Sequence, residues 1–465
     1  MRLSLTPLFT ALFAVFSMAA APAASAQTPA VVVPINWSSF TVAYPSDANA
    51  VLQHEILKNT NKYAVTTWYQ TAKKFADQTE THLNFGGIQE GSIRPSAAQA
   101  VALATSLKLG LYDPAHSGVS LEEAKEITLK LIRSLAYRHK ANSEGGWGDH
   151  WQSALWARYA GTAAWMLWAD LSPTDQEYVR KMIEHEANFL ITFRTPYYRN
   201  SEGTVISKGD SKAEENSWRF TILQFATAMM PQRPNPDIWM QKCLELMISA
   251  YSRPSDLANT TVLHGRPAKD WLKGSNVEED GTVINHNIIH PDYCAAVTQN
   301  VNAANLYSLA GRPTPQAALF NADIAYRAMA DVKFASPPHL PPGGTVYIEG
   351  SSDIYYPQGN DWGTGRRMNY AAFDGMANAF GLDKLTKHPG DYWEALHALA
   401  VLKMQGRSKD GRNYLSNKED SFTSREEAVS DAAARVCLSK WIIANKAFSL
   451  TNEGFKLQPP KGPNH

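Results

Sequence analysis

Apolar residues recur at helical spacing along most of the chain. In an amphipathic helix, a residue that faces the protein interior returns every three to four positions. This spacing predicts a dozen helices, at 47–77, 95–109, 120–139, 151–170, 173–193, 212–230, 235–252, 288–310, 315–332, 367–380, 390–404 and 424–447. Ser120 and Ser172 precede acidic first turns, and Pro173 follows Ser172 directly, so both serines are expected to begin helices.

The order of these elements predicts an all-α fold. Helices follow one another in pairs, and no run of alternating strand patterns separates them. Two arrays of helical hairpins are possible: a closed (α/α)6 or (α/α)7 toroid, and an open solenoid. A solenoid would show a sequence repeat of roughly 34 to 47 residues. The chain has none, which favours the toroid as a single catalytic domain over residues 27–465.

The first 26 residues have the pattern of a secretory signal peptide. Arg2 precedes an apolar run, and small residues lead to Ala26, after which we expect cleavage. No later stretch reaches the roughly 18 uninterrupted apolar residues that a membrane span requires. The mature protein is therefore predicted to be secreted or periplasmic, with no membrane contact after cleavage.

Composition excludes several classes of protein. The 465 residues carry 44 basic and 44 acidic side chains, so no basic excess marks a nucleic-acid-binding surface. Three scattered cysteines cannot support a disulfide scaffold. Aromatic residues make up 11% of the chain, and many lie beside Gly, Asn and His, which suggests a sugar-binding surface. We expect a monomer.

The densest chemical segment is 279–293, just before the helix predicted at 288–310. It holds Asn285, His286, His290 and Tyr293, groups that transfer protons or bind oxygens. The spacing of His286 and His290 would suit a zinc site on a helix, but the Glu of a His-Glu-x-x-His motif is absent and Pro291 disfavours a helix there. We therefore predict no metal and no cofactor. A second interpretation is a loop whose histidines cap a helix.

This segment resembles the catalytic stretch of toroidal polysaccharide lyases. The similarity covers about fifteen residues: Asp280-Gly-Thr, then Asn285-His286, then His290-x-x-Tyr293 entering a helix. It implies a carbon–oxygen lyase that cleaves an acidic polysaccharide, such as glucuronan or alginate, by β-elimination. His286 and His290 remain alternatives for the catalytic imidazole.

The resemblance also implies roles for residues outside the segment. Tyr293 would move the proton, and Asn216 would neutralise the uronate carboxylate, because amide donors stabilise charge where it develops. Trp218 would wall the pocket. As an alternative, the acidic residues around Asn216 simply complement a helix N-terminus.

Three further segments supply candidate substrate-binding residues. Glycines allow close backbone approach, aromatic rings stack on sugars, and arginines bind carboxylates. The candidates are Trp147, His150 and Gln152; Tyr356, Asn360, Arg366 and Arg367; and Arg94. The alternative for the second group is an exposed loop in which the arginines pair with Asp361.

Two other functions stay open. A glycoside hydrolase on the same toroid would use a pair of carboxyl groups, with candidates Asp149, Glu215, Asp292 and Asp361. A non-catalytic carbohydrate-binding protein would keep the aromatic residues without a proton-transfer cluster. Products separate these functions, because a lyase forms an unsaturated uronide that absorbs ultraviolet light and a hydrolase forms only new reducing ends.

Overall fold

Side-chain caps and glycines determine where several helices begin and end. Asp47, Ser120 and Ser172 each accept a hydrogen bond from a backbone N–H of the following turn, at 3.0 to 3.1 Å. Gly110 and Gly381 end two helices in the left-handed conformation, with φ of 69° and 71°. The helix starts predicted at Ser120 and Ser172 are therefore confirmed.

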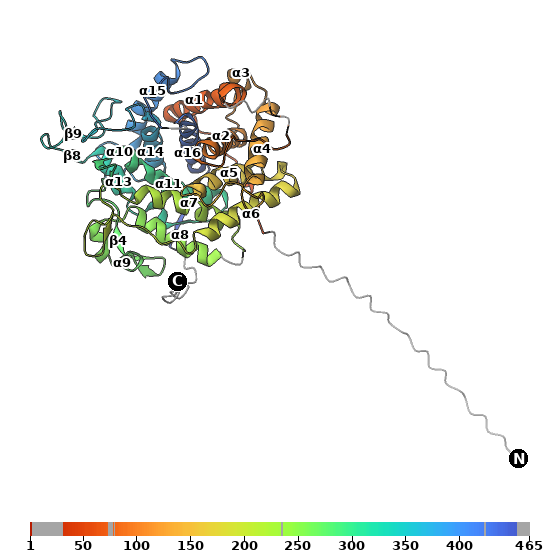
Figure 1. Cartoon of the computed structure of the whole chain (residues 1–465), viewed down its shortest axis with the longest axis horizontal. Coiled ribbons are helices and arrows are strands. Elements are labelled where there is room, and N and C mark those ends of the chain that lie inside the picture. Colours follow the sequence, from red (N-terminus) through yellow and green to blue (C-terminus); the bar gives the residue numbers. More distant parts are fainter. Residues whose placement is uncertain (2–30, 73–77, 79, 234–235, 423–424, 453–465) are drawn as a thin grey trace. The chain divides into compact units, whose positions relative to one another are not determined.

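The structure is a computed structural model that describes residue 1 and residues 31–72, 78, 80–233, 236–422 and 425–452 (Figure 1). Apart from Met1, the predicted signal peptide lies outside the described residues. From Val31 onward the chain clusters as one unit. Within the described ranges, no helix combines the length and the apolar character that crossing a membrane would require.

Inner and outer helices alternate along the chain and build two concentric layers (Figure 1). The inner layer consists of α2 (Glu90–Leu109), α5 (Ser153–Met166), α7 (Ala213–Met229), α11 (Thr298–Val301) with α12 (Ala303–Leu309), α14 (Arg367–Phe380) and α16 (Arg425–Ala444). The outer layer consists of α1 (Ala48–Tyr63), α4 (Leu121–Tyr137), α6 (Pro173–Phe189), α8 (Pro236–Ala250), α13 (Ala322–Ala330) and α15 (Gly390–Gln405).

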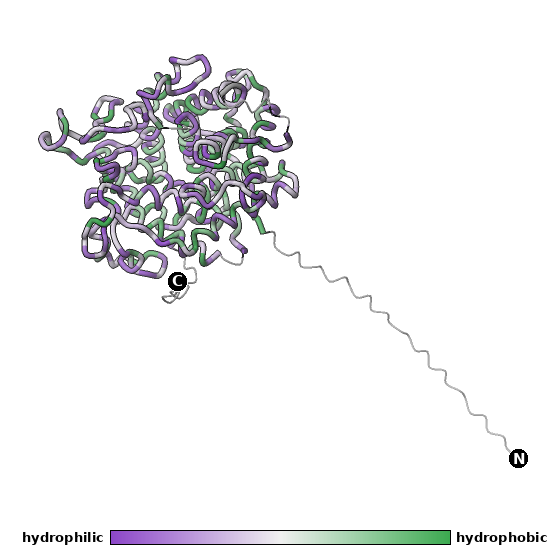
Figure 2. Tube along the Cα trace, in the orientation of Figure 1, coloured by the Kyte–Doolittle hydropathy of each residue, from purple (hydrophilic) through white to green (hydrophobic). Residues whose placement is uncertain are grey.

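The inner layer closes on itself, because α16 packs against both α14 and α2. Each outer helix packs against an inner neighbour, as α4 does on α2 and α15 does on α14. The predicted all-α toroid is therefore confirmed, and the described helices pair as (α/α)6. Inner helices are apolar on most sides: every residue of α5 is buried. Polar residues concentrate in the loops at the edges of the barrel (Figure 2).

Short elements complete the described chain. Short helices occupy α3 (Pro114–Ser117), α9 (Ala268–Trp271), α10 (Pro291–Cys294) and the 3-10 turns Trp37–Ser39, Trp168–Asp170, Pro254–Ala258, Ala295–Val297 and Gln316–Leu319. Antiparallel two-residue strands pair β1 (Arg199–Asn200) with β4 (Gly274–Ser275), β2 (Val262–Leu263) with β3 (Arg266–Pro267), β5 (Ile284–Asn285) with β6 (Ile288–Ile289), and β8 (Lys333–Phe334) with β9 (Gly344–Thr345). β7 (Thr314–Pro315) pairs in parallel with β10 (Leu450–Thr451).

Two predicted helices were wrong in extent. The helix expected at 288–310 begins as the strand β6 and continues as a succession of short helical pieces, because Pro291 starts a new element. The helix expected at 315–332 is regular only over Ala322–Ala330. In the opposite direction, α2 begins at Glu90, five residues before the predicted start, and continues through Pro95, which lies inside the helix.

Candidate functional site

A cavity of ≈ 210 Å³ is bounded by the inner helices α2, α5, α7, α14 and α16 and by the loops that precede them. Aromatic side chains form much of its wall: Trp151, Tyr159, Trp218, Tyr293, Trp362 and Phe422. Concave sites that combine aromatic walls with a few polar groups are the usual form of a small-molecule or sugar site. We therefore build the candidate site around this cavity.

A tight hairpin, β5 and β6, carries the histidines of the sequence motif to the edge of the cavity. Its turn residues His286 and Asn287 have φ of 52° and 65°, which matches the twist of a two-residue hairpin. Asn285 anchors the hairpin, because its amide donates to the buried carboxylate of Glu214 at 2.6 Å. Burial raises the pKa of Glu214 to about 8.

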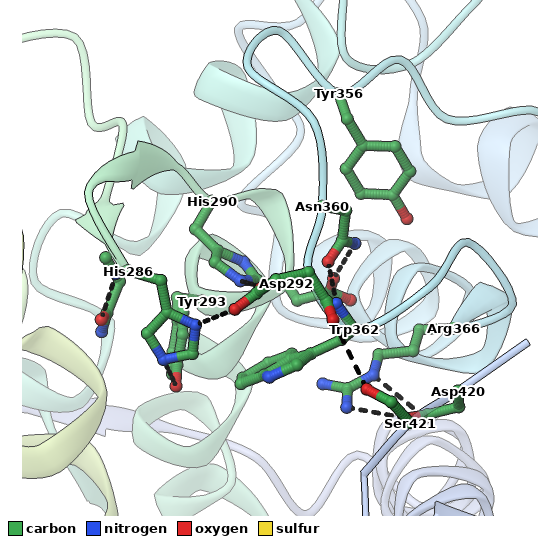
Figure 3. Close-up of polar contacts among 12 residues, drawn as sticks. His286, His290, Asp292, Tyr293, Tyr356, Asn360, Trp362, Arg366, Asp420 and Ser421 are labelled. Carbon is green, nitrogen blue, oxygen red and sulfur yellow. Dashed lines mark hydrogen bonds and ion pairs between the residues drawn. The ribbon is translucent and has the colours of Figure 1, made fainter. Parts of the chain in front are cut away.

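Hydrogen bonds join Tyr293, both imidazoles and Asp361. Figure 3 shows Tyr293, His286 and His290 close together at this point. The Tyr293 hydroxyl lies 3.2 Å from His286 Nε2, and His286 Nδ1 lies 2.6 Å from Asp361 Oδ2. His290 Nε2 lies 3.3 Å from Asp361 Oδ1. Burial raises the pKa of Tyr293 and lowers that of His290. Partial burial would raise the pKa of Asp361, but the hydrogen bond and charge of His286, a backbone hydrogen bond and the charge of His290 together outweigh burial, and the net shift is downward.

Asp292 is a buried carboxylate held by two amides. It lies in α10 and lines the cavity. Asn360 Nδ2 donates to its Oδ2 at 2.9 Å, and Asn369 Nδ2 donates to its Oδ1 at 3.3 Å. No lysine, arginine or histidine among the described residues lies within 4.0 Å of its oxygens, the distance of an ion pair. Figure 3 shows Asn360 and Asp292 above the ring of Trp362.

The arginines that line the cavity are already engaged by protein oxygens. The pairs are Arg94 with Glu90, Arg366 with Asp420, Arg425 with the carbonyl of Asp420, and Arg435 with Asp431. Arg366 also lies 3.8 Å above the Trp362 ring. Burial alone would lower the pKa of Arg366, but the carboxylates of Asp292 and Asp420 raise it. These arginines shape the wall and leave no unpaired cation for a ligand.

Glu427 is the cavity carboxylate that the sequence analysis missed. It lies in the first turn of α16, is 5% exposed and lines the cavity. Its carboxylate makes no hydrogen bond or ion pair with any residue that the structure describes. Its neighbour Glu426 instead accepts backbone N–H groups of Asn413 and Tyr414, and burial raises the pKa of Glu426 to about 7. In the sequence, both glutamates resemble ordinary acids at a helix start.

The structure brings five of the fourteen predicted site residues to the cavity wall. Those that line it are Arg94, Gln152, Trp218, Tyr293 and Arg366. His286, His290 and Asn360 lie directly behind this wall, in contact with Tyr293, Trp362 or Asp292. The predicted pairing of the arginines with Asp361 was wrong, since Arg366 binds Asp420 and Arg367 binds Asp353.

The other predicted residues lie outside the cavity wall. They are Trp147, His150, Asn216, Asn285, Tyr356 and Arg367. Trp147 is a core residue whose indole N–H donates to the carbonyl of Leu135, and the hydroxyl of Tyr356 accepts from Tyr370. The ring of His150 packs toward Trp156. The sequence could not reveal this, because a loop rich in glycine and tryptophan has the same composition whether it faces a ligand or the core.

Of the four carboxylates considered for hydrolysis, only Asp292 lines the cavity. Asp149 pairs with Lys140 and His185, and Glu215 pairs with Lys212. Asp361 is held by the two imidazoles. The second carboxylate of the cavity that lacks a cation is therefore Glu427.

Two groups of side chains have the composition of a metal site. His286, His290 and Asp361 offer ligand atoms that all lie within 4.8 Å of one another. Asp210, Glu214 and Glu215 do so as well, but Lys212 binds both Asp210 and Glu215 and neutralises that group.

Comparison with known proteins finds likeness in structure alone. The sequence matches no protein family and no curated protein sequence. Among solved structures, the GH76A α-1,6-mannanase of Salegentibacter sp. HEL1_6 is similar, with 13% identity and a TM-score of 0.42, over 83% of this chain and 99% of that chain. An inactive variant of that mannanase in complex with α-1,6-mannotriose matches over the same shares, with 13% identity and a TM-score of 0.41.

These findings correct the expected lyase. The two solved structures named above are of an α-1,6-mannanase, which is a glycoside hydrolase and not a lyase. The expected elimination centre is also incomplete. Asn216, assigned to neutralise a uronate, is fully buried, and its amide donates to the Pro196 carbonyl and the Ser249 hydroxyl, both at 3.1 Å. The predictions of a lyase and of a uronate polymer as its substrate were therefore wrong.

Proposed function

We propose that this protein is a glycoside hydrolase that binds a glycan in the aromatic cavity and cleaves it with Asp292 and Glu427. One observation supports the proposal above the others. Of the carboxylates that line the cavity, these two form no ion pair within 4.0 Å among the described residues, whereas Glu90, Asp420 and Asp431 each bind an arginine.

The surroundings of the two carboxylates suit different roles. Hydrolysis of a glycosidic bond needs an acid to protonate the leaving oxygen and a carboxylate to activate water or to attack the sugar. Asp292 receives two amide N–H groups, which bind acceptor oxygens and favour the base or nucleophile role. Glu427 accepts no hydrogen bond from the described residues, so its carboxyl group is left for the acid role.

The cavity wall suits a polysaccharide of neutral sugars. Tryptophan and tyrosine rings offer flat apolar faces on which sugar rings can stack, and Trp151 extends this surface to solvent with an exposed fraction of 50%. Unpaired arginines would favour an acidic polysaccharide, because they bind carboxylates strongly. The cavity arginines are bound to protein oxygens, so the acidic substrate expected from the sequence is not supported by the wall.

The test is to incubate the purified protein with mannan, glucan, xylan and uronate polymers and to measure new reducing ends. We expect release from a neutral polysaccharide, with Asp292→Asn and Glu427→Gln each lowering the rate by about 100- to 10,000-fold. Asp353→Asn and Glu349→Gln, which alter exposed carboxylates outside the cavity, should keep wild-type rates.

Two outcomes would contradict this function. An unsaturated product from a uronate polymer would show elimination instead of hydrolysis. Saturable glycan binding without any cleavage would show a non-catalytic carbohydrate-binding protein, the third function that the sequence left open.

We also propose that the mature protein acts outside the cytoplasm as a monomer. The signal-peptide pattern of residues 1–26 supports export. Mass spectrometry of the N-terminus after expression in a secreting host should find Gln27 as the first residue. An intact Met1 in the exported fraction would contradict cleavage at Ala26.

A further inference from the structure

Two imidazoles and a carboxylate converge beside the cavity, from segments about 70 residues apart. His286 and His290 come from the β5–β6 hairpin, and Asp361 comes from the loop before α14. Asp361 uses one oxygen for each ring, at 2.6 Å for His286 and 3.3 Å for His290. The two imidazole planes stand at 89° to each other, so the nitrogens approach the carboxylate from different directions.

The hairpin is the reason that two histidines four residues apart can share a ligand. The left-handed turn at His286 and Asn287 reverses the chain, and β6 returns it to His290. His290 is fully buried, while the side chains of His286 and Asp361 are 36% and 50% exposed. The group therefore has a fixed inner member and an open side through which an ion and water can enter.

No permanent cation competes for Asp361. Among the described residues, its ion pairs are with the two histidines alone. The other histidine–aspartate pair near this end of the barrel, His185 with Asp149, already contains Lys140. Two imidazoles with one carboxylate have the composition of a divalent transition-metal site.

We propose that His286, His290 and Asp361 bind one divalent transition-metal ion of the zinc class, through His286 Nδ1, His290 Nε2 and a carboxylate oxygen. A zinc ion at a catalytic or accessory site has three protein ligands such as these, and water occupies the remaining position. The Tyr293 hydroxyl, 3.2 Å from His286 Nε2, serves as the outer hydrogen-bond partner that orients a metal-bound imidazole.

An ion bound to Asp361 would also affect the cavity, through the residues on either side of Asp361 in the sequence. Asn360 and Trp362 flank Asp361 in sequence; the first donates to Asp292 and the second lines the cavity. A metal ion that joins Asp361 to the hairpin would hold both neighbours in place. The ion would thereby act as a positioning element for the wall, and its binding does not depend on the reaction that the cavity performs.

The test is to remove metal ions from the full-length protein with a chelator and then to titrate it with each ion. Binding of Co²⁺ is measured by visible absorption, and binding of Zn²⁺ is measured by calorimetry. We expect one ion per chain. His286→Ala and Asp361→Asn should each weaken binding by at least about tenfold. Both side chains are partly exposed, so thermal unfolding of the metal-free variants should match that of the metal-free wild type.

His185→Ala is the matched control, because it removes a histidine that also bonds an aspartate. It should leave the affinity for both ions unchanged. The proposal is overturned if the wild type binds no stoichiometric ion, if the two site variants bind as tightly as the wild type, or if His185→Ala weakens binding equally. Because metal binding is measured without substrate, failure here is separate from failure of the hydrolase proposal.

Discussion

Two buried glutamates support the two loops that the sequence marked as chemical, and they are satisfied to different degrees. Glu186 of α6 bonds three groups around the 145–152 loop: the His139 imidazole at 3.1 Å, the Asp149 backbone N–H at 3.1 Å and the Ser153 hydroxyl at 2.7 Å. Glu214 of α7 receives the Asn285 amide under the β5–β6 hairpin, and its second oxygen has no partner in the described structure.

The number of partners that each glutamate has distinguishes the structural 145–152 loop from the β5–β6 hairpin at the site. Around Glu186, each oxygen is used, and the loop that it holds buries Trp147 in the core. Around Glu214, an unsatisfied oxygen persists beneath the hairpin that positions His286 and Tyr293. Buried polar groups are normally paired, so the unpaired oxygen of Glu214 requires an explanation, such as a role at a functional site. Similar loop composition therefore conceals different roles, which the partners of the supporting carboxylate reveal.

The largest effect on stability is expected from Glu186→Ala. The substitution removes the hydrogen bonds that buried His139 Nε2 and the buried Ser153 hydroxyl make to Glu186, so the free energy of unfolding should fall by about 3 kcal/mol, as measured by urea denaturation. Glu177→Ala on the same helix removes a half-exposed ion pair and should cost less than about 1 kcal/mol. If both variants lost the same free energy of unfolding, Glu186 would not be the structural support of the 145–152 loop.

A smaller, pH-dependent effect is expected from Glu214→Gln. Because burial raises the pKa of Glu214 from 4.5 to about 8, the folded protein binds this proton more tightly than the unfolded chain. The wild type should therefore lose stability as the pH rises from about 5 to 8, and the variant should lack that part of the slope.

The neighbouring Glu215→Gln is the control for this titration, because Glu215 is ion-paired with Lys212 and partly exposed. Free energies of unfolding measured across the pH range for the three proteins give the comparison. If the wild type and Glu214→Gln had parallel profiles, the carboxyl under the hairpin would not be a high-pKa group.

The features of the fold that could be predicted are those that a short stretch of sequence determines by itself. Caps at Ser120 and Ser172 and the periodicity of most helices are local, and they were sufficient for the all-α toroid. The hairpin at His286 was not predicted, because its apolar residues also fit a helix that continues to 310. The hairpin differs from such a helix in the left-handed backbone conformation of His286 and Asn287. The spacing of apolar residues does not encode that conformation.

The site was less predictable than the fold, because it depends on contacts between distant segments. Asp292 was named as one of four possible acids, but its selection required the cavity and the amides of Asn360 and Asn369. Glu427 was missed, since a glutamate in the first turn of a helix is ordinary. Asn216 was assigned to the site from a resemblance, whereas its amide is consumed by Pro196 and Ser249.

The smallest effect, on glycan binding, is expected for Trp151, which connects the 145–152 loop to α7. Its ring lies at the end of the 145–152 loop, 5.5 Å from the ring of Trp218 on α7. Trp151→Ala should raise the KM for a glycan about 3- to 10-fold, the value of one aromatic contact, with kcat and stability little changed. Phe189→Ala, at an equally exposed ring on α6, should leave KM unchanged; a shift of KM there would show a general surface effect.

The central claim is that water cleaves a glycosidic bond between Asp292 and Glu427. It is tested most directly by digesting the responsive polysaccharide in heavy-oxygen water and weighing the products by mass spectrometry. We predict one heavy oxygen atom in each new product pair, with the signal lost in both Asp292→Asn and Glu427→Gln. Products without the label, or labelled products from either variant at the wild-type rate, would contradict the account.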